Sequence, residues 1–261
     1  MKKAIQLLSI VFLFVLTFTS CSSDDIGNQS DKVLLKKMVA SVMADHEVYT
    51  FSYKGTKLDK VNFEIEITTL NKGYDKYTYS GDLITEVERH INNQNIAKTV
   101  FTYNSANQLI QVIKLEFDSN RGIKSILTYN ENGTIDVTRF YGDLDTQTNQ
   151  FETNLFYVEN GEIVKYDYNG SSSWTTDFQY DAANNPLQNV TGTDKLKLYQ
   201  YTTNGLYGIN KNVSSVHSYS TDWDNQVDFE MQYSAKNYPV SSYSTASSSG
   251  PYSYQYEYYN Q

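Results

Sequence analysis

A tyrosine followed by a polar turn and a run of branched aliphatic residues recurs along this chain. Two clear copies are Phe101–Ile110 and Leu127–Ile135. Periods of the size seen here are typical of repeated supersecondary units. The chain is therefore constrained to fold as neighbouring copies of one small unit. The tyrosines that anchor successive copies lie 21 to 32 residues apart and are Tyr53, Tyr79, Tyr103, Tyr129, Tyr157, Tyr180, Tyr201 and Tyr233.

Each unit is predicted to be a β-hairpin. Apolar residues alternate with polar ones over Val61–Thr68, Val227–Tyr233 and Tyr252–Tyr258. A period of two is expected of a strand with one buried face. The pairs Asn132-Gly133 and Asn160-Gly161 are strong hairpin-turn signals, because both residue types tolerate a positive φ.

The segment Asp31–His46 fits two interpretations. Its apolar residues could line a helix capped by Asp31. The segment could equally form a first strand that turns at Ala44-Asp45-His46. We favour the strand, because the hairpin repeat then starts there without a gap.

These patterns predict an all-β fold, a long antiparallel meander of repeated hairpins with about 16 to 18 strands. Twisted open sheets rarely exceed about ten strands without curling, so a curled single sheet or a barrel-like shell is expected. A closed barrel of this many strands would be too wide for its own side chains to fill. The curled sheet, which could enclose a cavity, is therefore the expected form.

The N-terminal region is predicted to be an export signal. Residues 1–20 begin with Lys2 and Lys3 and continue with an apolar stretch from Leu7 to Phe18. This arrangement is typical of a secretory signal, and the stretch is too short for a membrane span, which needs roughly 20 apolar residues.

The only cysteine, Cys21, follows Thr19-Ser20 in a pattern that resembles the lipobox of bacterial lipoproteins. The resemblance implies cleavage before Cys21, acylation of its thiol, and a membrane partner held through the acyl chains. Residues 21–31 are expected to be a flexible tether, with residues 32–261 forming the hairpin-repeat domain. Ser22–Asp25 resembles the signal that sends Bacteroidota lipoproteins to the cell surface, and the periplasmic face of the outer membrane is the alternative location.

Net charge argues against a nucleic-acid partner. The formal net charge is -9, and removing residues 1–20, which hold two lysines and no acids, brings it to -11. A chain this acidic, without a basic stripe, is poorly suited to phosphate backbones. With one cysteine no internal disulfide can form, so the fold must rest on packing.

Some segments resemble known families. Tyr180–Leu187 resembles a degenerate tyrosine–aspartate (YD or Rhs) repeat. Tyr77–Ile84 and Leu34–Val39 are similar to segments of Bacteroidota lipoproteins of unknown function, a group with a porin-like β architecture. The resemblance implies an architecture for residues from Lys32 onwards and implies no activity.

No metal centre is expected. His46, His90 and His217 are far apart in sequence, in a turn and two strands, without the spacing of metal ligands. Asp143 and Asp145, in a long loop before Gln150, lack the ligand series of a calcium loop.

An enzyme is not expected either, and no cofactor is predicted. Glu64/Glu66 and Glu86/Glu88 place paired carboxylates on one strand face, a spacing that could serve glycoside hydrolysis. Solvated strand faces show the same pattern. A nucleophile elbow and a phosphate-binding glycine loop are both missing from the sequence.

Trp174 and Trp223 fall between the predicted strands and are the candidate ligand-binding residues. Large amphipathic rings are favoured at recognition surfaces. The leading hypothesis is a non-enzymatic outer-membrane lipoprotein that acts as a binding or structural module for a glycan or a protein. The alternative is a carrier of a lipid or other hydrophobic molecule within the curled sheet.

Overall fold

The structure is a computed structural model, and it describes residues 32–42, 45–66, 70–200, 208, 210–244 and 251–260. The predictions for residues 1–31, which include the signal peptide, Cys21 and the tether, lie outside the described residues. The anchor Tyr201 lies outside them as well.

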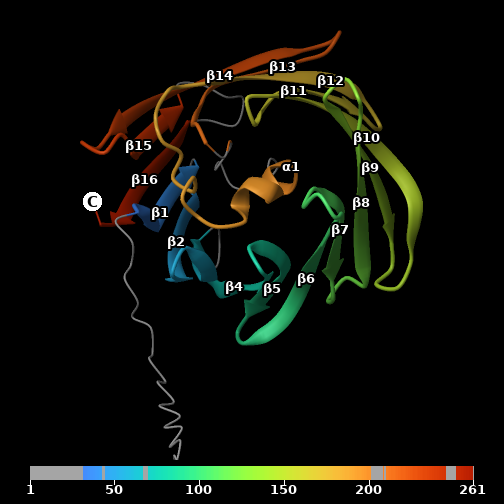
Figure 1. The fold of residues 1–261 in the computed structure, drawn as a ribbon, viewed down its shortest axis with the longest axis horizontal. Coiled ribbons are helices and arrows are strands. Elements are labelled where there is room, and N and C mark those ends of the chain that lie inside the picture. Colours follow the sequence, from blue (N-terminus) through green and yellow to red (C-terminus); the bar gives the residue numbers. More distant parts are fainter. Residues whose placement is uncertain are drawn as a thin grey trace, which may run out of the picture.

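The described strands form one closed antiparallel barrel in which each strand pairs with its neighbours in sequence and β1 pairs with β16 (Figure 1). The all-β prediction and the expected number of strands are confirmed. The strands are β1 (Leu34–Val42), β2 (Asp45–Lys54), β3 (Lys57–Glu66), β4 (Leu70–Ser80), β5 (Leu83–Ile91), β6 (Gln94–Tyr103), β7 (Leu109–Glu116), β8 (Arg121–Tyr129), β9 (Thr134–Gly142), β10 (Gln147–Glu159), β11 (Glu162–Asn169), β12 (Ser173–Tyr180), β13 (Val213–Tyr219), β14 (Asp224–Tyr233), β15 (Pro239–Ser244) and β16 (Tyr252–Tyr259).

Closure depends on the segment that the sequence left ambiguous. Residues of β1 pair with β16, with Met38 opposite Tyr256 and Ala40 opposite Tyr254. The strand interpretation of this segment is therefore confirmed. His46, which we placed in a turn, instead lies in β2 opposite Ser41, because the two strands continue pairing to the end of β1.

The apolar face of the sheet points into the barrel. On β3, Val61 and Phe63 are buried, whereas the alternating residues Asn62 and Glu64 are exposed. Phe63 also covers Gly73 on β4, where an added Cβ would lie 2.6 Å from the Phe63 ring. The alternation assigns the apolar residues to the lumen and the polar residues to the outer surface.

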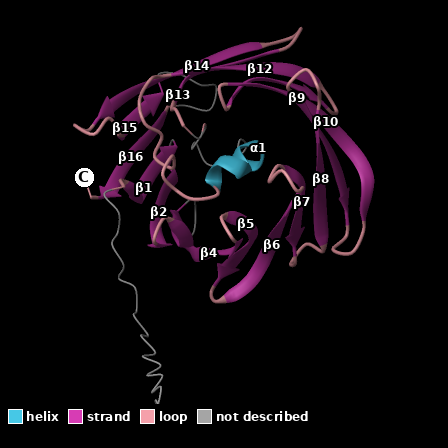
Figure 2. Cartoon of the chain, in the orientation of Figure 1, coloured by secondary structure: helices cyan, strands magenta, loops and turns pink. Residues whose placement is uncertain are grey.

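A segment between β12 and β13 enters the barrel, and we call its described residues, 181–200, 208 and 210–212, the plug. It carries the short helices η1 (Thr193–Leu196) and α1 (Lys197–Gln200). Figure 2 shows α1 within the ring of strands. The prediction that Tyr180–Leu187 opens a hairpin is therefore wrong: β13 begins only at Val213.

Buried polar contacts explain why this copy of the repeat does not turn back directly. The amide of Asn185, which is 1% exposed, donates to the carbonyls of Gly208 and Lys211 and accepts from the Leu187 amide at 2.9 Å. The buried carboxylate of Glu162 accepts hydrogen bonds from the backbone amides of Asn210 and Lys211. These side chains hold the plug in place by satisfying its backbone groups.

The sheet is closed, although we expected a curled sheet because a closed barrel of this size would be too wide to fill. The plug explains how the closed barrel is filled. Leu187 and Val190 pack with the core residues of β1, β2, β3 and β16. Leu196 and Leu198 pack with the core residues on the other side of the ring. A closed barrel of this size can therefore bury its inner face, because the inserted segment supplies the side chains that the strands alone lack.

The recurring tyrosines join neighbouring strands through their hydroxyl groups. In five hairpins the tyrosine near the end of the second strand donates to a backbone carbonyl of the first strand. The pairs are Tyr53 to Leu35 at 2.7 Å, Tyr103 to Ile84 at 2.7 Å, Tyr129 to Leu109 at 3.0 Å, Tyr180 to Ile163 at 2.7 Å and Tyr258 to Pro239 at 2.7 Å.

Three anchors depart from this pattern. Tyr79 donates to the Thr191 carbonyl of the plug at 3.2 Å. Tyr157 donates to the Asp167 carboxylate at 3.0 Å on the outer face, and Tyr233 donates to Asp181 at the start of the plug. The register also shifts beside many anchors, for example between Thr102 and Tyr103. Many anchor tyrosines therefore lie beside a β-bulge near the end of a strand, whether or not they bond to a carbonyl of the same hairpin.

Candidate functional site in the barrel lumen

A cavity of about 390 Å³ lies between the plug and the inner face of the first strands. We call it the lumen cavity. Pockets that hold small molecules are of this size and mostly apolar. The apolar part of its lining is Met38, Tyr49, Phe51, Leu58, Val61, Tyr77, Val87, Ile96, Ala97, Phe101, Leu187, Leu196 and Tyr199.

The plug forms part of the wall of the lumen cavity. The Tyr199 ring meets Phe101 edge to face, with ring centroids 5.3 Å apart. Its hydroxyl lies 3.4 Å from the Thr99 hydroxyl of β6, and Leu196 beside it is 1% exposed. The cavity is therefore bounded by packed side chains from both the sheet and the plug.

Charged groups line the other part of the lumen cavity. The Arg89 guanidinium on β5 donates two hydrogen bonds of 2.8 Å to Asp75 on β4. Lys114 pairs with Glu116 at 2.7 Å on β7. Asp118, in the turn between β7 and β8, lines the cavity and has no ion pair among the described residues. Three carboxylates thus face two cations.

Each of the two ion pairs favours the charged form of one of its members. Hydrogen bonds to Asp75 raise the pKa of Arg89. The hydrogen bond from Lys114 lowers the pKa of Glu116. Among the residues that line the cavity each cation is matched to a carboxylate, and Asp118 is the carboxylate left over. Arg121, outside the lining, also acts on Glu116.

The structure brings Trp174 and Trp223 together, with ring centroids 6.4 Å apart. Trp174 lies in β12 and not between strands as we expected, because the pairing of β12 with β11 extends to Ser173. Trp223 lies in the turn between β13 and β14, as expected, and is 44% exposed. Both line a pocket that we call the aromatic groove, formed by Tyr166, Ser172, Trp174, Thr176, Phe178, Val216, Ser218 and Trp223.

A polar row continues from the aromatic groove across the inner face. Tyr168 stacks on Trp174 at 3.6 Å between centroids, and its hydroxyl is hydrogen-bonded to Glu152. Glu152 pairs with Arg139 at 2.7 Å and accepts from Asn154 at 3.1 Å. Arg139 Nε and Asn154 Oδ1 are buried without a hydrogen-bond partner, so this row has capacity for further polar contacts.

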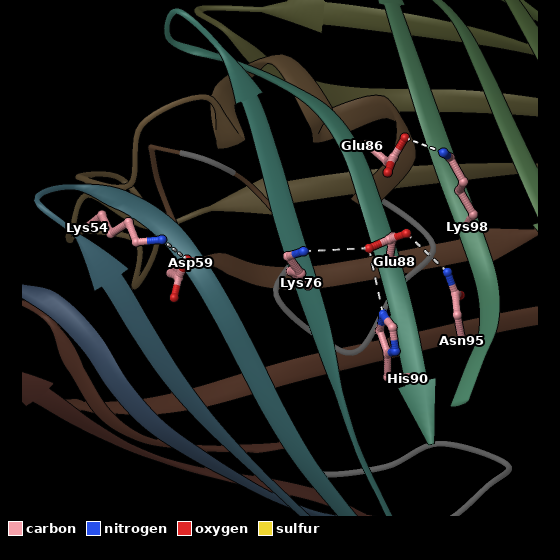
Figure 3. A network of polar contacts seen from close by, with 8 residues as sticks. All are labelled: Lys54, Asp59, Lys76, Glu86, Glu88, His90, Asn95 and Lys98. Atoms are coloured by element: carbon pink, nitrogen blue, oxygen red, sulfur yellow. Dashed lines mark hydrogen bonds and ion pairs between the residues drawn. The ribbon is translucent and has the colours of Figure 1, made fainter. Parts of the chain in front are cut away.

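The carboxylate pairs considered above lie on the outer surface. Glu86 pairs with Lys98, and Glu88 contacts Lys76 at 4.0 Å and Asn95 at 3.1 Å (Figure 3). Glu64 pairs with Lys72 at 3.0 Å. These carboxylates are held in ion pairs on the face opposite the lumen cavity.

The candidate metal ligands are not brought together. His90 stacks on Tyr74 at 4.6 Å, and His217 lies 3.1 Å from Asp224. Asp143 accepts hydrogen bonds from the backbone amides of Asp145 and Thr146, so it caps a turn. Among the residues that the structure describes, no group of three or more metal-ligating side chains forms a cluster.

Sequence reasoning missed the charged residues of the lumen cavity. The available signal was register: Arg89 shares a strand face with Val87 and Ile91, which are apolar. A charged residue at an inward position of an otherwise apolar strand face is unusual. Asp75 has the same signal, because it shares a face with Tyr77.

Two solved structures share this architecture. A porin-like protein from Bacteroides uniformis matches with a TM-score of 0.58 over 86% of this chain and 98% of that chain, at 10% sequence identity. A porin-like protein from Bacteroides vulgatus matches with a TM-score of 0.56 over 88% of this chain and 100% of that chain, at 12% identity. The expected porin-like β architecture is confirmed, and at these identities the likeness concerns the fold alone.

Neither the known family models nor the curated proteins match the sequence. The tyrosine–aspartate repeat family and the lipoprotein group therefore stay resemblances. Among the described residues, no helix has the length and apolar character needed to cross a membrane.

Proposed function

We propose that this protein is a non-enzymatic lipoprotein that binds a small, mostly apolar molecule in the lumen cavity. The observation that carries this proposal is the cavity itself, about 390 Å³ in volume and bounded by apolar side chains of the sheet and the plug. Its charged groups come from β4, β5, β7 and the turn that follows β7, and a small set of polar groups in an apolar pocket can orient an amphiphile.

The charges of the lumen cavity favour a ligand whose polar end is neutral or cationic. Arg89 and Lys114 are already paired with Asp75 and Glu116. A carboxylate or phosphate entering beside them would approach Asp118 without a free cation among the lining residues to balance it. Burying such an unpaired charge is costly, so anionic amphiphiles are disfavoured.

The outer surface supports a barrel that is tethered to a membrane and not embedded in it. A barrel that spans a bilayer presents an apolar band on its outer face. Here outward positions around the ring carry charged side chains, and many of these pair across strands. Examples from different strands are Lys37, Glu64, Lys76, Glu88, Lys98, Asp136, Asp167, Asp177, Asp228 and Glu257.

The proposed tether is an acylated Cys21 in the outer membrane, on the cell surface or on the periplasmic face. Acyl chains supply about 0.8 kcal/mol per buried methylene, and more than one chain gives a stable anchor. Incorporation of labelled palmitate into the wild type and into Cys21→Ala tests the anchor. Protease treatment of intact cells then distinguishes the two faces.

The binding proposal is tested on protein purified from cells without detergent, as the Cys21→Ala variant so that no acyl chain enters the lumen. Organic extraction followed by mass spectrometry should recover an amphiphile in near-stoichiometric amount. The Ala97→Trp variant places an indole in the lumen cavity and should lose that molecule. Equal recovery from both proteins, or no molecule from either together with no uptake of added amphiphile, would refute the proposal.

A further inference from the structure

We propose that the aromatic groove is a second binding site, which takes a neutral oligosaccharide. It shares no lining residue with the lumen cavity. The groove is built on β11, β12 and β13 and the turns beside them, whereas the strand residues of the lumen cavity belong to β1 to β7. The proposal therefore stands apart from the function proposed above.

The aromatic groove offers a stacking surface that is already ordered. The Trp174 ring is stacked on Tyr168, and its Nε1 donates to the Tyr166 hydroxyl at 3.1 Å. Trp223 is tilted by 52° relative to Trp174 and is 44% exposed. An exposed indole beside a fixed one is suited to the flat C–H face of a sugar, because aromatic rings combine a large apolar surface with a polar edge.

Hydroxyl groups adjoin these rings. Ser172, Thr176 and Ser218 line the groove, and the Thr176 and Ser218 hydroxyls are 2.9 Å apart. Hydroxyl groups can both donate and accept, so they match the hydroxyls of a sugar. A purely apolar ligand would gain nothing from them.

The polar row beside Tyr168 extends the site along the inner face. Asn154 is directly opposite Tyr168 on the neighbouring strand and is 4% exposed. Its Oδ1 atom and the Arg139 Nε atom are buried without partners. Such atoms need a hydrogen-bond partner, which a sugar hydroxyl or a water molecule fixed by the sugar would supply. Because the polar row continues from the aromatic groove, the combined site favours an oligosaccharide over a single sugar.

The charges near the aromatic groove favour a neutral sugar over an anionic one. Asp222 precedes Trp223 in the turn between β13 and β14, whereas Asp224 is turned to His217 on the outer face. The Arg139 guanidinium is held by the Glu152 carboxylate at 2.7 Å, so it is not free to pair with an anionic group. Uronic acids and sulfated sugars would meet net negative charge, and like charges disfavour binding.

Intrinsic fluorescence reports on this site directly, because the chain has two tryptophans and both line the groove. The full chain with Cys21→Ala is titrated with cellotetraose, maltotetraose, chitotetraose and mannotetraose, and with tetragalacturonate as the anionic comparator. At least one neutral tetrasaccharide should shift and saturate the emission with a Kd below about 1 mM. Tetragalacturonate should bind at least tenfold more weakly.

Substitutions test whether the change in tryptophan emission comes from binding in the aromatic groove. Trp223→Ala, measured by calorimetry, should weaken binding at least tenfold, and Trp223→Phe should retain part of the affinity. Tyr243→Ala removes another exposed ring, 46% exposed on β15, and should bind like the wild type.

Three results would overturn the proposal. They are no response to any neutral tetrasaccharide, unchanged binding by Trp223→Ala, and preferred binding of tetragalacturonate. A neutral hydrophobic dye in the lumen cavity should stay bound during the titration. Its release would place the sugar in the lumen cavity and also contradict a separate site.

Discussion

The hydroxyl of Tyr103 donates a hydrogen bond of 2.7 Å to the carbonyl of Ile84, 19 residues earlier on the neighbouring strand. Equivalent bonds join four other hairpins, so this contact recurs at several of the repeated tyrosines. A buried carbonyl that keeps its partner avoids a penalty of about 1 to 3 kcal/mol. The tyrosines therefore fix the ends of hairpins whose turns differ in length.

Replacing Tyr103 with phenylalanine should lower the free energy of unfolding by about 1.5 kcal/mol, because the Ile84 carbonyl loses a buried partner. Urea denaturation followed by circular dichroism measures the change. Tyr157→Phe is the matched control, since its hydroxyl bonds Asp167 on the outer face, and it should cost less than about 0.5 kcal/mol. An equal loss of unfolding free energy in the two variants would show that the bond to the Ile84 carbonyl stabilises the fold no more than a bond on the outer face does.

Alkaline pH should unfold the barrel. Burial raises the pKa of Tyr53, Tyr180 and Tyr258 well above the ordinary tyrosine value of 10.0. Below pH 10 these tyrosines are neutral in both states, and their ionisation has no effect on stability. Above pH 10 they ionise in the unfolded chain first, so each buried tyrosine lowers the free energy of unfolding by about 1.4 kcal/mol per pH unit.

Tyrosinate absorbance and far-ultraviolet circular dichroism, recorded together from pH 9 upwards, check this expectation. The buried tyrosines should ionise in a single step that coincides with loss of strand signal. Smooth ionisation of all tyrosines with the strand signal intact would contradict it.

The strands could be predicted from the sequence more fully than the residues of the lumen cavity and the aromatic groove. Alternation in segments such as Val61–Thr68 depends on local physics, because a half-buried strand must alternate, and the hairpins followed from it. Closure depends instead on pairing between β1 and β16, which are separated by almost the whole chain. The position of the plug depends on buried contacts of Asn185 and Glu162. Nothing in local pattern distinguishes these side chains from those of a polar turn.

The candidate ligand-binding residues were predicted only in part, because their proximity also depends on long-range strand pairing. Trp174 and Trp223 stood out by residue type, and their proximity required the register of β12 to β14. The charged residues of the lumen cavity required knowledge of which strand face is inward.

Asn185→Leu should release the plug. The change leaves the Leu187 amide and the carbonyls of Gly208 and Lys211 without their partner, at a cost of about 3 kcal/mol or more. Limited proteolysis should then cleave within residues 181–212 before the strands. Asn184→Ala, which removes one exposed contact to the Lys236 carbonyl, should cost less than about 1 kcal/mol. Resistance of Asn185→Leu to cleavage would show that packing alone holds the plug.

The lumen cavity should prefer cationic and neutral amphiphiles to anionic ones. Decylamine and decanol should displace a bound dye more readily than decanoate, because Asp118 is the unbalanced charge of the cavity. Asp118→Asn should remove the advantage of decylamine over decanol. Asp145→Asn, in the neighbouring turn between β9 and β10, should leave it unchanged. A stronger effect of decanoate in the wild type would reverse this assignment of charge.

Binding of the neutral fluorescent probe N-phenyl-1-naphthylamine to the Cys21→Ala protein tests the central claim most directly. The probe should bind at one site per barrel. Ala97→Trp should abolish binding because its side chain enters the lumen cavity. Thr102→Trp, with the same indole on the outer face of the same strand, should bind like the parent. Equal binding by the two variants, or no binding by the parent, would contradict a ligand site in the lumen.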